Sequence, residues 1–163
     1  MSRPGPLLRR LLALPTALYH HGWGFLLGER FLELEHVGRR TGRTHHTVLE
    51  VVAHVPGTGE VAVLAGFGAT SDWLLNLRSG GPARVHLGRR DFAARCRSVP
   101  AEEAESLLGG YERRNRLAGP VVRRVLSALV GWPYDGTPAA RRRLVEQLPM
   151  VALAPQSPEE GRR

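Results

Sequence analysis

The feature that most constrains the fold is the alternation of apolar and charged side chains in FLELEHV, residues 31–37. Leu32 and Leu34 fall on one face and the glutamates between them on the other, which predicts a β-strand with one face in water. Two β-branched runs follow at 45–54 and 60–66, separated by the turn sequence VPGTGE. Because no helical pattern separates these three strands, the sequence favours antiparallel pairing.

The remaining pattern predicts an α+β domain. A short helix begins near Ser71, which can cap it, and ends at Gly80 and Gly81. A chain of 163 residues with 42% apolar content is one ordinary domain. Further expected elements are a hairpin at 83–99, helices at 100–116, 119–131 and 138–148, and a last strand at 150–154. The fold class is therefore α+β, with helices around an antiparallel sheet or barrel.

We expect three parts along the chain. Residues 1–28 form a helical segment whose apolar run, Leu7 to Tyr19, is interrupted by Pro15 and is too short to span a bilayer. Two arginines at its edge suit anionic lipid, so this segment either docks on the domain or lies on the membrane. Residues 29–155 form the barrel domain, and 156–163 form a disordered tail.

The charge of the chain indicates an acidic partner. The net charge is +8, and all 23 basic residues are arginine, whose planar fork of donors suits phosphate and carboxylate groups. Nucleic acid, an anionic membrane surface or an acidic small molecule would match this charge. Nucleic-acid binding is the remote alternative, because aromatics make up only 6% of the chain and no recognition motif is present. We therefore expect no nucleic-acid partner.

Cysteine usage bounds the compartment. Cys96 is the single cysteine, so an internal disulfide is excluded, and no Cys/His pair has the spacing of zinc ligands. These features favour a cytoplasmic protein without a metal site. A membrane-bound N-terminal segment would place it at the inner face of the cell membrane.

Two loops indicate an anion-binding site. The turn GRRTGR, residues 38–43, joins two strands that should pair, so its arginines would be displayed at one end of the sheet. In the loop GFGATSDW, Gly66 and Gly68 allow backbone N–H groups to approach a ligand, and the positive end of the following helix lies beside them. Together the two loops predict a cofactor site.

Three stretches resemble the deazaflavin-dependent nitroreductase and quinone reductase family: GRRTGRTHHTVLEV, VAVLAGFGATSDWLLNLRSGGPARVHLGRRDFAARCRSV and LPMVALAP. The resemblance covers about residues 31–155 in order, and its most specific parts are the Gly-Arg-x-Thr-Gly turn and Asp-Trp-x-x-Asn. It implies a split β-barrel like that of FMN-binding proteins. It also implies coenzyme F(420), a deazaflavin whose side chain carries a phosphodiester and several glutamates, with FMN as the alternative cofactor.

The resemblance also implies site residues. The turn would hold the acidic side chain of the cofactor, the next strand would run along it, and the loop and short helix would enclose the ring. The implied cofactor-binding residues are Arg39, Arg40, Thr41, His45, His46, Thr47, Val48, Leu49, Ala65, Gly66, Phe67, Asp72, Trp73 and Asn76. Ser71, Tyr111 and Tyr134 are candidates for the substrate side, and no residue is singled out as catalytic.

The implied activity is hydride transfer from reduced deazaflavin to a quinone, nitro or activated-alkene acceptor. Gly66 and Phe67 stand where the nitroreductases carry a serine and a basic residue, which predicts better reduction of quinones than of nitroimidazoles. The alternative is a split barrel that binds F(420), FMN or a lipid without turnover. The oligomeric state, monomer or homodimer, is left open.

Overall fold

The computed structural model describes residues 29–156, in which six strands form a closed antiparallel barrel in the order β1-β2-β3-β6-β5-β4. The strands are β1 (Phe31–Val37), β2 (Thr44–His54), β3 (Val61–Leu64), β4 (Ala83–Leu87), β5 (Arg90–Ser98) and β6 (Met150–Pro155). The helices are α2 (Asp72–Arg78), α3 (Ala101–Arg114), the 3-10 turn η2 (Arg116–Ala118), α4 (Gly119–Val130) and α5 (Pro138–Gln147). The predicted α+β barrel with flanking helices is confirmed.

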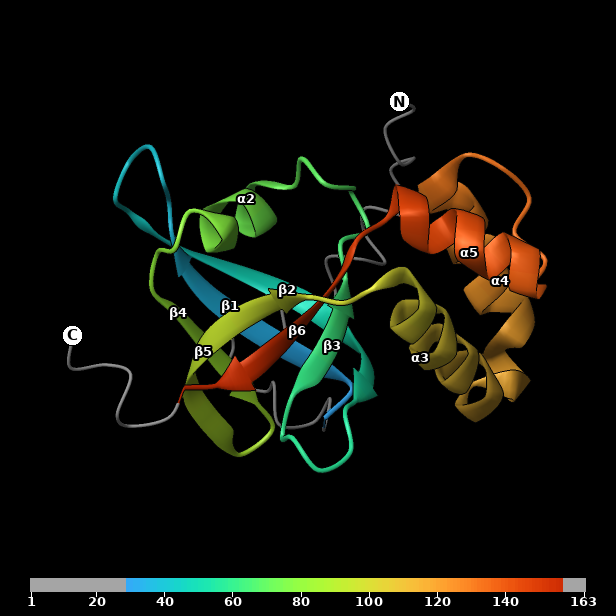
Figure 1. The fold of residues 1–163 in the computed structure, drawn as a ribbon, viewed down its shortest axis with the longest axis horizontal. Coiled ribbons are helices and arrows are strands. Elements are labelled where there is room, and N and C mark those ends of the chain that lie inside the picture. Colours follow the sequence, from blue (N-terminus) through green and yellow to red (C-terminus); the bar gives the residue numbers. More distant parts are fainter. Residues whose placement is uncertain (1–28, 157–163) are drawn as a thin grey trace.

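The helices lie on two sides of the barrel (Figure 1). The short helix α2 and the turn between β1 and β2 lie at one end, whereas α3, α4 and α5 group together on the opposite side. The predicted N-terminal helix lies outside the described residues, as do residues 157–163 of the predicted tail. Gln156, the first tail residue, still donates from its backbone to Ala93, 2.9 Å away.

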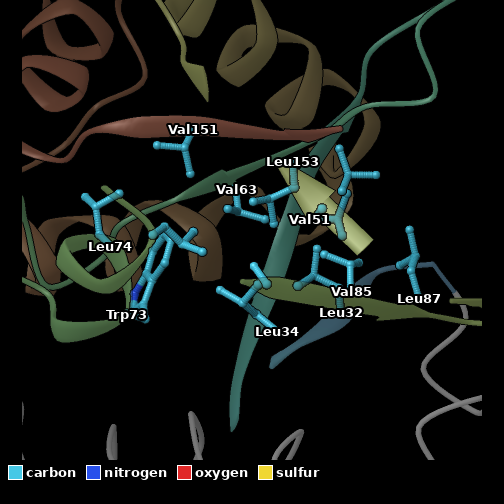
Figure 2. Packing of buried hydrophobic residues seen from close by; sticks show 14 of the residues in the cluster. Leu32, Leu34, Val51, Val63, Trp73, Leu74, Val85, Leu87, Val151 and Leu153 are labelled. Carbon is cyan, nitrogen blue, oxygen red and sulfur yellow. The ribbon is translucent and has the colours of Figure 1, made fainter. Parts of the chain in front are cut away.

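The barrel interior is one apolar core. Inward-facing side chains from every strand meet there, and Trp73 and Leu74 of α2 cover the end of this core (Figure 2). Leu34 pairs with Val85 across β1 and β4, and both are fully buried. The partly buried Cys96 packs against the same cluster, as expected for a core cysteine.

A second core fills the space between the barrel and the helices. Ala62 of β3 and Ala152 of β6 point away from the interior and are fully buried beneath the helical layer, which includes Leu108 and Leu144. Both strands are therefore apolar on both faces. The outer faces of β1 and β4 are more exposed, which explains why charged or polar side chains alternate with buried apolar ones in both strands.

The ends of two helices illustrate how local signals act. Thr137 caps α5 by accepting a hydrogen bond from the backbone N of Ala140 at 3.2 Å, as the Thr-Pro start predicts. Ser71 holds the N-cap position of α2, but the predicted side-chain cap is absent. The hydroxyl of Ser71 instead donates to the carbonyl of Gly68 at 2.7 Å, because the preceding loop turns back on itself there.

Candidate functional site

A cleft of about 710 Å³ lies between the β1–β2 turn, the start of β2 and α2. It brings together the loops at 38–43 and 66–73, which the sequence predicts to form one anion-binding site. The predicted site residues that line it are Arg39, Arg40, Thr41, His45, His46, Thr47, Phe67, Ser71, Asp72, Trp73 and Asn76. His36, Gly38 and Thr70 also line the cleft and were not predicted.

The floor of the cleft is a buried polar network around His36, which is 3% exposed. Its Nδ1 lies 3.1 Å from Nδ2 of Asn76, and its Nε2 lies 3.3 Å from Oγ1 of Thr47. The ring stacks on His45, its partner across the strands, with centroids 5.7 Å apart. Burial lowers the pKa of His36, and the neighbouring His45 and His46 lower it further, which keeps this imidazole neutral at neutral pH.

The β1–β2 turn is shaped by glycine. A Cβ at Gly38 would lie 2.8 Å from Oγ1 of Thr41 and 2.9 Å from Nε2 of His45, so no other residue fits without a shift. Gly42 has φ 65°, the left-handed region that glycine favours, and its N–H donates to the carbonyl of Gly38. The turn therefore stays tight while its polar side chains border the cleft.

The two arginines of the turn have different environments. Arg39 Nη1 donates to Oδ1 of Asn76 at 2.8 Å and to Oδ1 of Asp72 at 3.1 Å, which ties the turn to α2. Arg40 is exposed and has no hydrogen bond or ion pair with any residue of the described chain. Of the pair, Arg40 is thus the guanidinium available to an anionic ligand.

The loop before α2 differs from the expectation in its backbone. The N–H of Gly66 donates to Leu64 and that of Gly68 to Ala65, so neither is available to a ligand. The positive end of α2 is already faced by the carboxylate of Asp72 in its first turn. The loop instead contributes side chains to the cleft: Phe67, which is 58% exposed, together with Thr70 and Ser71.

Four predicted cofactor residues do not line the cleft. Val48 lies on the outer face of β2, opposite Glu33, whereas Leu49 points inward and packs on the barrel core. Ala65 is fully buried in that core. A Cβ at Gly66 would meet Leu129 of α4 at 3.5 Å, so this position faces the helical layer.

The two tyrosines proposed for the substrate side also lie away from the cleft. Tyr111 is 9% exposed, and its hydroxyl donates to Oε1 of Glu50 at 2.7 Å. Tyr134 is 4% exposed and donates to Oε1 of Glu112 at 2.7 Å. Both hydroxyls are held inside the helical side of the molecule because their carboxylate partners are there.

The sequence pattern of β1 could have identified His36 as a site residue. Leu32 and Leu34 face the interior, and the same period of two places His36 on that face, at the end of the strand. A histidine on an inward face beside a basic turn is a site candidate. No comparable signal marks Thr70, which is exposed in an irregular loop.

Residues 29–156 contain neither a cluster of metal-ligating side chains nor a membrane-spanning helix. No group of three or more His, Cys, Asp or Glu side chains there is arranged to hold a metal ion. No helix in that range has both the length and the apolar character needed to cross a membrane.

Comparison with solved structures shows the fold. A protein of unknown function from Agrobacterium tumefaciens str. C58 superposes with a TM-score of 0.52 at 12% identity, over 89% of this chain and 56% of that one. This chain thus spans little more than half of that relative. An F(420)-H2 dependent reductase gives a TM-score of 0.46 at 16% identity, over 78% of this chain and 95% of that one.

An FMN-binding protein from Nostoc punctiforme, related to pyridoxamine 5'-phosphate oxidase, gives a TM-score of 0.45 at 15% identity, over 88% of this chain and 78% of that one. No curated protein sequence matches the chain. The family model of the F(420)H(2)-dependent quinone reductases matches residues 20–117, more than half of the chain. The chain therefore belongs to this family of oxidoreductases, whose cofactor is coenzyme F(420).

Proposed function

We propose that the cleft binds coenzyme F(420) and that the protein passes hydride from the reduced cofactor to a quinone-like acceptor. The observation that carries this proposal is the pairing, in one cleft, of a cationic end with an aromatic end. Arg40 supplies the charge of the first, and the exposed Phe67 supplies the second. A ligand with an acidic side chain and a flat ring matches both ends.

The residues of the cleft fit this cofactor. The guanidinium of Arg40 can form charge-assisted hydrogen bonds with a phosphodiester or glutamate, which are roughly twice as strong as neutral ones. Phe67 offers an aromatic face for stacking, and the buried Trp73 forms an apolar wall beside it. The volume, about 710 Å³, lies within the range of roughly 300–1,000 Å³ typical of ligand pockets.

The reduced cofactor, when bound, supplies the hydride. The part left to this chain is to bind and orient, since the cofactor carries the hard chemistry. Ser71 was a candidate proton donor, but its hydroxyl proton is committed to the carbonyl of Gly68. We expect the proton that follows the hydride to come from water, because most of the polar residues at the rim are exposed.

Two measurements test the proposal. Fluorescence titration should give tighter binding of F(420) than of FMN, because FMN lacks the glutamate tail. Menadione added to reduced F(420) and protein should then bleach the absorbance of the reduced cofactor. Equal affinity for FMN would contradict the cofactor assignment, and a reduced cofactor that persists with menadione would indicate a binding protein without turnover.

We also propose that residues 1–28 hold the protein on anionic lipid, close to membrane quinones. The support is the sequence alone: an apolar run beside Arg9 and Arg10. Deletion of residues 1–20 should abolish co-sedimentation with anionic liposomes and leave the barrel folded. A truncated protein that unfolds would show instead that the segment is structural.

A further inference from the structure

Four residues at the floor of the cleft form a chain of hydrogen bonds that runs from Arg39 through Asn76 and His36 to Thr47. Asn76 and His36 are 4% and 3% exposed, so the middle of the chain is shielded from water. Each of the four also lines the cleft. The direction of every hydrogen bond in this chain follows from its first member.

Arg39 fixes the orientation of the Asn76 amide. The backbone N of Arg39 lies 3.1 Å from Oδ1 of Asn76, and its Nη1 lies 2.8 Å from the same atom. Backbone N–H and guanidinium groups only donate, and a guanidinium keeps its charge throughout the working pH range. Oδ1 must therefore face Arg39, which turns Nδ2 of Asn76 towards His36.

The amide in turn fixes the tautomer of His36. Nδ2 of Asn76 donates, so Nδ1 of His36, 3.1 Å away, must accept. A neutral imidazole with a bare Nδ1 carries its proton on Nε2. That Nε2–H then donates to Oγ1 of Thr47, 3.3 Å away.

The opposite direction is disfavoured by the same atoms. If Thr47 donated to His36, the proton on Nδ1 would require Oδ1 of Asn76 on that side. Nδ2 would then face the backbone N–H and the guanidinium of Arg39, leaving donors opposed to donors in a buried position. Buried polar groups without partners cost about 1–3 kcal/mol each.

Thr47 therefore accepts within the network and keeps its own hydroxyl proton for another partner, which no described residue supplies. We infer that Thr47 donates a hydrogen bond to an oxygen acceptor of the ligand in the cleft, with Arg39, Asn76 and His36 as positioning residues that set this direction. The inference rests on the proposed function. It assigns the ligand class at this depth: a carbonyl, phosphoryl or hydroxyl oxygen binds, whereas an amino group would face a donor.

Titration of four proteins with F(420) tests the donor. Thr47→Val is nearly isosteric and lacks the hydroxyl, so its affinity should fall about tenfold, while Thr47→Ser should stay within about twofold of the parent. Arg40→Ala serves as the reference for a working site, because its contact lies elsewhere in the cleft. Thr47→Val that binds as tightly as the parent, in a series where Arg40→Ala binds weakly, overturns the inference.

Nitrogen-15 NMR of the ligand-free protein tests the direction independently of the cofactor. We expect the His36 resonances of the parent to show a protonated Nε2 and a bare Nδ1. In Asn76→Asp a carboxylate oxygen faces the ring, so Nδ1 should become protonated and the F(420) affinity should fall as in Thr47→Val. A protonated Nδ1 in the parent overturns the inference. A parent that binds no F(420) overturns the proposed function instead, and the tautomer then decides the hydrogen-bond direction alone.

Discussion

The two sides of the barrel each contain a partly buried polar network, and the two end differently. On the helical side, Tyr134 and Arg141 both bond to the carboxylate of Glu112, at 2.7 and 2.6 Å. At the cleft, the chain that begins at Arg39 ends on Thr47, whose hydroxyl proton has no acceptor in the described structure. The first network is closed and the second is open.

The comparison separates structural from ligand-binding polar residues. Burial and hydrogen bonding to Glu112 raise the pKa of Tyr134, and burial beside Glu50 raises that of Tyr111, so both phenols stay neutral and satisfied. The resemblance to the family made both tyrosines candidates for the substrate side. The partner of each hydroxyl decides the matter, because a hydroxyl that already donates its proton to a carboxylate has no proton left to donate to a ligand.

The largest expected effect comes from breaking the closed network. Glu112→Ala leaves the buried hydroxyl of Tyr134 and the guanidinium of Arg141 without their common acceptor. The free energy of unfolding should fall by about 3 kcal/mol, while the F(420) affinity of the folded protein should hardly change. Urea unfolding and cofactor titration measure the two quantities.

A matched control is Glu105→Ala. Glu105 pairs with Arg142 at 2.7 Å, but the arginine side chain is 64% exposed. Loss of this ion pair should therefore barely affect the free energy of unfolding. If Glu105→Ala and Glu112→Ala destabilised the protein equally, the closed network would have no special role.

Removal of Arg40 should have the opposite effect, a loss of F(420) affinity without a loss of stability. Arg40→Ala should weaken F(420) binding by roughly tenfold or more, since a charge-assisted contact is worth about 1.5–3 kcal/mol, and leave unfolding unchanged within about 0.5 kcal/mol. Added salt should reduce the affinity of the variant less steeply than that of the parent. Titrations at two salt concentrations give both values, and unchanged affinity would reduce GRRTGR to a charged turn.

Arg39→Ala sharpens this contrast. Arg39 ties the turn to Asn76 and Asp72, so its removal should lower both the stability, by about 1–2 kcal/mol, and the F(420) affinity. The ratio of the two effects distinguishes a positioning arginine from a ligand-binding one. Equal behaviour of the two variants would contradict the division of roles between neighbouring arginines.

The open network should also be sensitive to acid. His36 has a lowered pKa in the folded protein. As the pH falls below 6.5, the ordinary pKa of histidine, this residue is protonated in the unfolded chain before it is protonated in the native one. The free energy of unfolding should therefore decrease with falling pH. The groups facing His36 are His45 and His46, which lower its pKa, Asp72, which raises it, and the Asn76 amide and Thr47 hydroxyl, which do not titrate in this range.

His36→Gln checks this term. Glutamine does not titrate, so the variant should lose less stability than the parent between about pH 7 and pH 5, whatever its stability at pH 7. Urea unfolding at several pH values gives the slopes. Identical slopes for parent and variant would place the acid sensitivity elsewhere.

The smallest expected effect concerns Gly66. The sequence suggested that a serine here could orient a nitro group, yet a Cβ at this position faces Leu129 and not the cleft. Gly66→Ser should therefore leave the ratio of kcat/KM for menadione and a nitroimidazole unchanged within about twofold. A shift towards the nitroimidazole would mean that the loop rearranges when ligands bind.

Local patterns predicted the fold well, for a physical reason. Alternation in β1 and the breaks at Gly80 and Gly81 act within a few residues, so the elements could be placed from the sequence. The separate roles of Arg39 and Arg40 could not. They depend on Asn76, which meets Arg39 only after the barrel and α2 have folded.

Part of the candidate site likewise could not be predicted from the sequence. The lining by the GRRTGR turn followed from two paired strands and a short connection. That Gly66 faces α4, or that Tyr111 ends on Glu50, depends on packing between segments far apart in the chain. No pattern within either segment records such a contact.

The closure of the barrel has a consequence for synthesis of the protein. β6 lies between β3 and β5, and Val61 pairs with Leu153 near the other end of the chain. Until residues 150–155 leave the ribosome, β3 and β5 each keep an unpaired edge, which is the kind of surface that recruits other chains. A translation stall anywhere between residues 99 and 149 therefore leaves a chain exposed to aggregation, and completion of the last strand removes both edges at once.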